Sequence, residues 1–184
     1  MKYPFLLMTI LGALYGCKNP PVETSASVSS NSVELDSTSR NPFEELDYFE
    51  RNKKEFRTDT FSIEGNSTEG GELVVYHAAE NDFLVFDFWL FGEMGKQHST
   101  YLTNKKLDFK LVKKVVFKYD KPLFEPDYKE SFTEEYILFE GGKAVAYFDA
   151  FKKEKDHPSE ELKGKGNSAK EQFHELTKDI KIVK

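Results

Sequence analysis

The feature that most restricts the fold of this 184-residue chain is a series of seven apolar segments separated by turn-rich breaks. No helical pattern of about 10–15 residues lies between any two of them, which disfavours a parallel sheet. Gly141-Gly142 separates the last two segments and suits a type I′ hairpin turn, because both positions need positive φ. The sequence therefore predicts a mainly β, α+β fold around an antiparallel meander, with strands at residues 60–64, 72–79, 83–91, 97–103, 107–119, 132–140 and 143–151.

The alternation of apolar and polar residues predicts how two of these strands are buried. In residues 107–119 most apolar side chains fall on one face, so this strand should have one dry face and one solvated face. Lys113 interrupts the apolar face. In residues 83–91 both faces are apolar except at Asp87, so either both faces are covered or one aromatic face is open.

A helix is predicted at the start of the folded region. Asn41 can cap it, Pro42 suits its first position, and Glu44 stands at the third position, as in a capping box. The helix should end near Lys54. Its apolar stripe should pack on the sheet and consists of Phe43, Leu46, Phe49 and Phe56.

A second helix is predicted near the end of the chain. Residues 157–166 have the composition of a polar loop, after which Asn167 or Ser168 can cap a helix over about 169–178. Its stripe consists of Phe173, Leu176 and Ile180. The two helices could together cover both faces of a curved sheet.

The first residues have the pattern of a secretory signal. Lys2 gives a positive start, an apolar run covers residues 3–14, and a small residue precedes Cys17. The run is shorter than the ~20 apolar residues that cross a bilayer well. Residues 1–16 are therefore predicted to be a signal peptide.

Leu14-Tyr15-Gly16-Cys17 resembles the lipobox of bacterial lipoproteins. The resemblance implies cleavage before Cys17, acylation of its thiol and new amino group, and anchoring in a membrane. Lys18 stands where that family carries Asp for inner-membrane retention, which implies the outer membrane. An ordinary cleaved signal and an uncleaved anchor are the alternatives. Because Cys17 is the only cysteine, no internal disulfide can form.

A Ser-rich segment without aromatic residues follows the cysteine. Residues 17–40 cannot bury enough surface to offset their ordering entropy, so we expect a flexible tether with a reach of ~25–30 Å. Residues 41–184 then form a single β-rich domain. That domain loosely resembles uncharacterised β-meander lipoproteins, a likeness that implies no activity and is carried by Leu138-Phe139-Glu140-Gly141-Gly142-Lys143 and Tyr147-Phe148-Asp149.

Composition and motifs argue against several classes of protein. A content of 15% aromatic residues is atypical of a disordered chain, and a net charge of -6 disfavours a nucleic-acid partner. The four His are scattered without metal-ligand spacing, and the sequence has no Gly-x-Ser-x-Gly elbow. If Cys17 is acylated, thiol catalysis is excluded as well. We therefore expect no metal, no cofactor and no catalytic residue.

The best candidates for binding are Phe83, Trp89 and Phe91, on one face of a predicted strand. Aromatic rings offer a large contact area to sugars or apolar partners. The alternative is that a terminal helix covers this face as part of the core.

Two weaker candidates are a basic row and an acidic loop. Lys110, Lys114 and Lys118 could meet an anion, or could simply be solvated. Asp120, Glu125 and Asp127 of one loop could offer oxygen ligands to calcium, although their spacing matches no known calcium loop.

Three functional hypotheses follow. The first is a lipid-anchored, non-catalytic module of the cell envelope that binds an envelope protein, a glycan or an apolar ligand. The second is an immunity or inhibitor lipoprotein that antagonises a basic toxin or a lysozyme-like enzyme. The third is a hydrolase of envelope polymers that uses a pair of carboxylates about 5–10 Å apart in a cleft.

Overall fold

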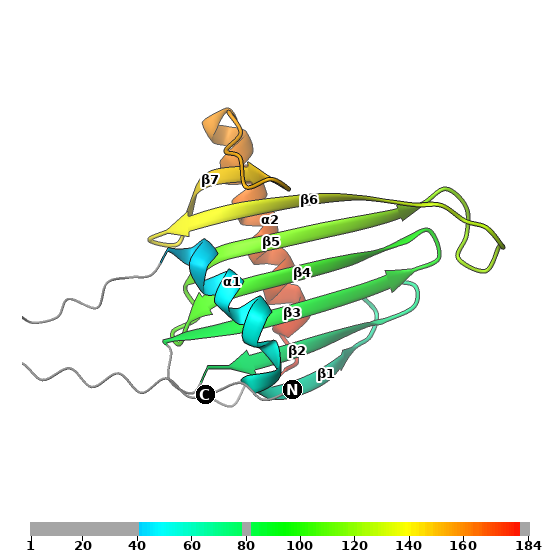
Figure 1. Ribbon diagram of the computed structural model, residues 1–184, viewed down its shortest axis with the longest axis horizontal. Coiled ribbons are helices and arrows are strands. Elements are labelled where there is room, and N and C mark those ends of the chain that lie inside the picture. Colours follow the sequence, from blue (N-terminus) through cyan, green and yellow to red (C-terminus); the bar gives the residue numbers. More distant parts are fainter. Residues whose placement is uncertain (1–40, 79–81, 181–184) are drawn as a thin grey trace, which may run out of the picture. The chain divides into compact units, whose positions relative to one another are not determined.

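The computed structural model describes residues 41–78 and 82–180 (Figure 1). The predicted signal peptide, Cys17 and the tether lie outside these residues. The elements are α1 (Pro42–Asn52), η1 (Lys53–Glu55), β1 (Arg57–Ile63), β2 (Gly71–His77), β3 (Phe83–Gly92), β4 (Gly95–Asn104), β5 (Phe109–Tyr119), β6 (Glu130–Glu140), β7 (Lys143–Asp149) and α2 (Ser159–Thr177).

The seven strands form one antiparallel sheet in the order β1-β2-β3-β4-β5-β6-β7. Each strand pairs with its neighbours in sequence, which confirms the predicted meander. The sheet is open and not strongly curved, in contrast to the curved sheet expected. The two helices lie on opposite faces of the sheet (Figure 1).

Strand β5 begins later than predicted because Leu107 belongs to a turn. Its φ of 70° is left-handed, a conformation that a strand residue does not adopt. The Asn104 side chain stabilises this turn by accepting hydrogen bonds from the N–H groups of Lys106 and Asp108. Leu107 is therefore not the first residue of the alternating face.

Helix α1 begins where the sequence predicted. Asn41 Oδ1 accepts a hydrogen bond from the N–H of Phe43 at 3.0 Å, and Pro42 occupies the first turn. Leu46 and Phe49 on its inner face are buried in a core that includes side chains of β2 to β6. Burying each such side chain stabilises the fold by about 1.5–3 kcal/mol, so packing fixes the helix on the sheet.

Helix α2 begins at Ser159, ten residues earlier than predicted, and the interpretation of residues 157–166 as a polar loop was wrong. Gly164 and Gly166 suggested a loop, yet both lie inside the helix. A Cβ on Gly166 would stand 2.6 Å from the Cβ of Ala144, so glycine is what allows close approach of α2 to β7. Tertiary packing overrides the low helix propensity of glycine here.

Successive residues of each strand point to opposite faces of the sheet, so their side chains form two separate cores. The core beneath α2 contains Leu73, Phe86, Phe88, Tyr101 and Phe173 among others. The core beneath α1 contains Phe49, Tyr76, Phe83, Val85 and Leu102 among others. Helix α1 covers one end of its face, and the end that carries the β5–β6 loop lies beyond it (Figure 1).

Candidate functional site

The aromatic face predicted on β3 is divided by the end of α1. Phe83 is 2% exposed and packs against Phe56 at 6.0 Å between ring centroids, so it belongs to the core and not to a binding surface. Trp89 is half-buried, and Phe91 is 38% exposed. The face is therefore covered at the Phe83 end of the strand and open at the Phe91 end.

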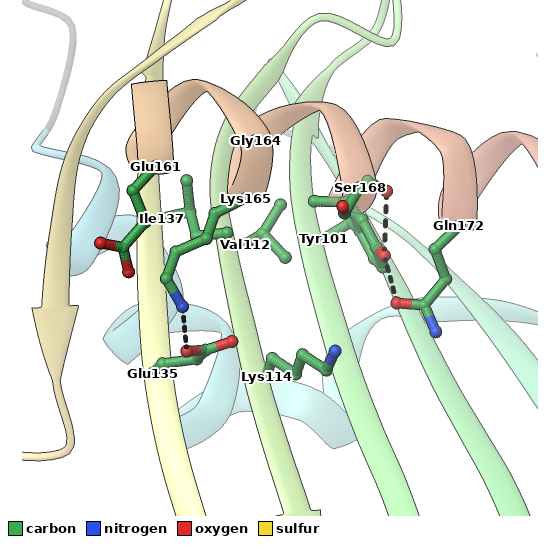
Figure 2. Close-up of a pocket in the computed structure, with 11 residues that line it drawn as sticks. Tyr101, Val112, Lys114, Glu135, Ile137, Glu161, Gly164, Lys165, Ser168 and Gln172 are labelled. Atoms are coloured by element: carbon green, nitrogen blue, oxygen red, sulfur yellow. Dashed lines mark hydrogen bonds and ion pairs between the residues drawn. The ribbon is translucent and has the colours of Figure 1, made fainter. Parts of the chain in front are cut away.

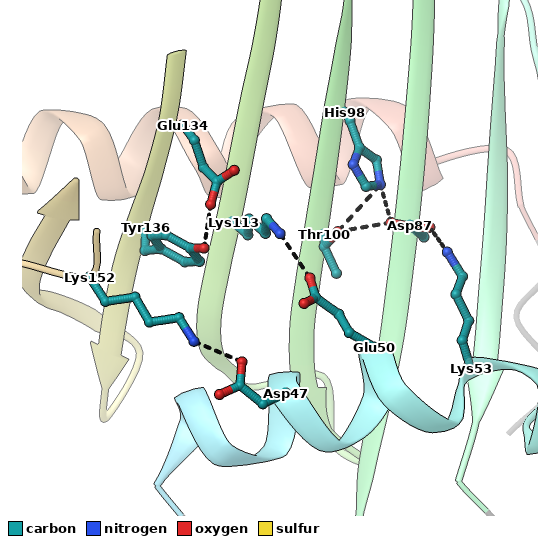
Figure 3. Close-up of polar contacts among 10 residues, drawn as sticks. All are labelled: Asp47, Glu50, Lys53, Asp87, His98, Thr100, Lys113, Glu134, Tyr136 and Lys152. Atoms are coloured by element: carbon teal, nitrogen blue, oxygen red, sulfur yellow. Dashed lines mark hydrogen bonds and ion pairs between the residues drawn. The ribbon is translucent and has the colours of Figure 1, made fainter. Parts of the chain in front are cut away.

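A row of polar residues separates these two ends. Asp87 pairs with Thr100 across β3 and β4, Thr100 with Lys113, and Lys113 with Tyr136. The row lies along the side of α1 (Figure 3). Asp87 and Lys113 each interrupt the apolar pattern of a strand in the sequence. In the structure they belong to the same row, with Thr100 between them.

Asp87 is the centre of this row, with a side chain only 3% exposed. Its carboxylate accepts hydrogen bonds from Lys53 Nζ at 2.6 Å and from Thr100 Oγ1 at 2.8 Å. Nε2 of His98 lies 2.5 Å from Oδ1 and carries the proton that it donates, because an ionised carboxylate can only accept. Three donors therefore hold one buried charge (Figure 3).

The pKa of Asp87 reflects two opposing effects. Burial raises it, but the hydrogen bonds and charges of His98 and Lys53 outweigh burial and lower the pKa from 3.8 to about 2. The pKa of Lys53 is correspondingly raised, because its bond to Asp87 outweighs its own burial. Asp87 is therefore ionised at neutral pH and acts as an anchor for η1 rather than as an acid.

Ion pairs fix α1 in its place over the sheet. Glu45 pairs with Lys110 at 2.8 Å, and Glu50 pairs with Lys113 at 2.8 Å. Asp47 pairs with Lys152 at 2.7 Å from beyond β7. The more exposed pairs of Glu50 and Asp47 each contribute about 1 kcal/mol or less, whereas Glu45 is buried, and the three pairs together define the position of the helix.

Beyond the polar row lies a group of aromatic side chains from neighbouring strands. Trp89 stacks on His98 with ring centroids 4.1 Å apart and planes 7° apart. Phe91 and Phe117 each lie 6.2 Å from Trp89, in nearly parallel planes. Phe132 on β6 lies 5.9 Å from Phe117 and is 61% exposed.

Apolar residues of two connections extend this group. In the β5–β6 loop, Leu123 and the 76% exposed Phe124 stand next to each other. The N–H of Leu123 donates to the carbonyl of Glu93 at 2.9 Å, which attaches this loop to the β3–β4 turn. We call the whole region the distal surface, defined as Trp89, Phe91, Met94, Phe117, Leu123, Phe124, Tyr128 and Phe132.

The distal surface concentrates the exposed apolar side chains of the described residues. In residues 41–78 and 82–180, eight large apolar residues are exposed. Six of these eight belong to the distal surface. The other two are Val145 and Phe151. Scattered exposed apolar residues are normal, but clustered ones mark contact sites.

Sequence reasoning missed most of the distal surface. Phe117 and Phe132 could have been found, because the alternation and meander order place them on neighbouring strands. Met94, Leu123 and Phe124 lie in connections without periodicity, so no pattern assigns them to a face. Only the backbone contact between the two connections brings them together.

The two weaker candidates are not supported as sites. A bulge in the β4–β5 pairing at Lys110 sends this residue to Glu45 of α1, whereas Lys114 lies beneath α2, so the lysines form no single row. In the β5–β6 loop, Asp120 accepts a hydrogen bond from the N–H of Lys129 at 2.7 Å. Within the described residues, no group of three or more His, Cys, Asp or Glu could hold a metal ion.

A pocket of about 680 Å³ lies on the opposite face, between α2 and strands β5 and β6 (Figure 2). It contains two carboxylates, Glu135 and Glu161. Glu135 pairs with Lys165 at 3.2 Å and accepts a hydrogen bond from Tyr147, while Glu161 pairs with His157 at 3.3 Å. Both carboxylates are thus occupied by partners, which does not favour the acid and base pair of a glycoside hydrolase.

No known protein family, curated protein or solved structure matches this chain. No helix within the described ranges is long and apolar enough to cross a membrane. The interpretation of the site therefore rests on its own geometry.

Proposed function

We propose that this chain is a lipid-anchored, non-catalytic module of the cell envelope that binds a partner protein through the distal surface. The observation that supports the proposal is the concentration of exposed apolar side chains at one end of the sheet. Soluble monomers seldom expose contiguous apolar patches larger than a few hundred Å² unless they bind something.

The composition of the distal surface favours a protein as the partner. Aromatic residues and Met are enriched at the centres of protein interfaces, and all but Leu123 of the distal surface belong to these types. Met94 adds an adaptable side chain at the β3–β4 turn. The surrounding charges include Lys96, Lys121, Asp127 and Glu130, which resembles the polar rim of an interface.

A glycan is less well supported as the partner. Sugar sites combine an accessible ring face with free hydrogen-bonding groups, but His98 covers one face of Trp89. The nearby polar groups of Lys96 and Glu130 pair with each other at 3.2 Å. Because these charges have both signs, no feature of the surface specifically favours a basic toxin or lysozyme-like enzyme either.

The proposed anchor explains how such a module would be placed. Acylation of Cys17 would hold the chain at a membrane, since two or more acyl chains give stable binding at ~0.8 kcal/mol per buried CH₂ group. Residues 18–40 would then allow the domain to reach a partner within ~25–30 Å of the headgroups.

Site-specific photo-cross-linking in the cells that produce the protein tests the proposed surface. A photoreactive phenylalanine analogue is placed at Phe132, at Phe124 or, as the matched control, at Phe151, which is exposed but lies outside the distal surface. We expect one adduct of the same mass from the first two positions and none from Phe151. The adduct at Phe132 should disappear when Phe91 is changed to Ser.

Three results would contradict the proposal. Equal adducts from all three positions would indicate non-specific contact. Persistence of the Phe132 adduct in Phe91→Ser would show that the cluster does not act together. An adduct that is removed by glycosidase treatment but not by protease would identify a glycan as the partner instead.

A further inference from the structure

The pocket beneath α2 has the features of a ligand site that is separate from the distal surface. It lies on the other face of the sheet, with β5 and β6 as its floor and the first half of α2 as one wall (Figure 2). Its volume of about 680 Å³ falls within the range of small-molecule sites, roughly 300–1,000 Å³. An inference about this pocket therefore does not rest on the proposed function.

Helix α2 borders the pocket with small residues. Gly164 and Ser168 are exposed where α2 borders the pocket, and Ala169 is buried, whereas Phe173 and Leu176 fill the core at the other end of the helix. A Cβ added to Gly164 would meet no atom within 4 Å. The close contact of Gly166 with Ala144 holds the helix at a fixed height above this space.

The floor of the pocket is apolar. Val112 and Ile137 contribute aliphatic side chains, and Tyr101 contributes its ring. The hydroxyl of Tyr101 shares its one proton between the carbonyl of Ala169 at 3.2 Å and Gln172 Oε1 at 3.4 Å, which turns the polar end of this residue away from the floor. A ligand with an apolar body would therefore bury it here.

The polar groups with unused capacity in the pocket are donors. Lys114 has no ion-pair or hydrogen-bond partner among the described residues, and Figure 2 shows its ammonium group within the pocket without a contact. Gln172 uses its oxygen for Tyr101, so its amide NH₂ group remains available. The carboxylate of Glu135 is already compensated by Lys165, and Glu161 is an exposed residue of α2 beside His157.

We infer that this pocket binds a small amphipathic anion, with its carboxylate or phosphate against Lys114 and its apolar body on Val112 and Ile137. Charge complementarity selects an anion, because the lysine is the one uncompensated charge on the pocket floor in the described part of the chain. The donors of Gln172 and Ser168 flank the same end of the pocket and can complete the headgroup's hydrogen bonds.

Calorimetric titration with ligands that differ only in the headgroup tests the inference. The full chain carrying Cys17→Ser, which removes the proposed acylation site, is titrated below micelle concentrations with octanoate, octyl phosphate, octanol and octylammonium. We expect octanoate or octyl phosphate to bind at least tenfold more tightly than the other two. Comparison of these two anions distinguishes a carboxylate site from a phosphate site.

Two substitutions place the binding in this pocket. Ser168→Phe places a ring at the exposed edge where Ser168 borders the pocket, so it should raise the dissociation constant at least tenfold while the midpoint of thermal unfolding stays nearly the same. Lys114→Gln should raise the dissociation constant of the anion at least tenfold. Lys118→Gln is the matched control, since Lys118 lies on the same face of β5 but outside the pocket, and should change the constant less than twofold.

The inference is overturned by any of three results. The four ligands could bind equally, which would indicate an unselective apolar site. Ser168→Phe, correctly folded by its melting curve, could bind the anions like the parent chain. Lys114→Gln and Lys118→Gln could weaken binding to the same extent, which would reduce the effect to general surface charge.

Discussion

Asp87 is the one polar side chain in β3, and it links the covered and open ends of the sheet. Its partners Lys53 and His98 come from η1 and β4, so the residue joins three elements. The sequence shows Asp87 as an interruption in an apolar strand but cannot show why. The carboxylate of Asp87 is paired with Lys53, which lies 34 residues earlier in the chain. No local sequence pattern connects Lys53 to β3.

We expect Asp87→Asn to lower the free energy of unfolding by about 2 kcal/mol. The substitution removes the charge that compensates Lys53, but this lysine side chain is 40% exposed, so water recovers part of the loss. Urea unfolding at neutral pH measures the change. Asp59→Asn, which disturbs a more exposed pair with His77, is the matched control and should cost less than about 1 kcal/mol.

The stabilisation from Asp87 should disappear in acid. Because folding lowers the pKa of Asp87 from 3.8 to about 2, this contribution is complete above pH ~4 and is lost as the pH falls through 2. The shift corresponds to about 2 kcal/mol at roughly 1.4 kcal/mol per pH unit. The difference in unfolding free energy between the parent chain and Asp87→Asn should therefore shrink from pH 5 to pH 2, and a constant difference would contradict the assignment.

At the scale of elements, α2 shows where sequence patterns fail. The two glycines at 164 and 166 weaken the helical signal, and the first half of the helix has no apolar stripe to compensate. The structure assigns the glycines different roles, one in contact with β7 and the other beside a pocket. The role of Gly166 cannot be predicted without knowing that Ala144 lies opposite.

The same substitution at the two glycines should have different effects. Gly166→Val places side-chain atoms against Ala144, so we expect it to lower the free energy of unfolding by about 2 kcal/mol. Gly164→Val has open space and should change stability by less than about 0.5 kcal/mol. Chemical denaturation of both variants gives the comparison, and equal effects would show that helix propensity, not packing, decides.

At the scale of the whole molecule, the order of the strands can be predicted from the sequence. Which part of a sheet face stays exposed cannot be predicted in the same way. Short connections leave antiparallel neighbours as the simplest arrangement, and the meander is confirmed. Helix α1 lies across the strands, so along each strand it covers only about its own diameter of 10–12 Å, whereas the ten residues of β3 span about 33 Å (Figure 1). One short helix therefore leaves part of the sheet uncovered, and the distal surface lies there.

The proposed anchor can be tested separately from the surface. Metabolic labelling with radioactive palmitate should mark the parent protein and leave Cys17→Ala unlabelled, because that substitution removes the only thiol in the chain. Equal labelling of both proteins would contradict acylation at Cys17. The variant should keep the parent's unfolding midpoint when both are compared in the same detergent.

The most direct test of the account is the affinity of the cross-linked partner, once purified, for variants of the distal surface. Phe124→Ser with Phe132→Ser removes two exposed rings that are not part of either core, so the fold should persist while the dissociation constant rises at least 30-fold. Phe151→Ser, an equally conservative loss of an exposed ring elsewhere, should change it less than twofold. If the double variant binds as tightly as the parent chain, the distal surface is not the site of binding.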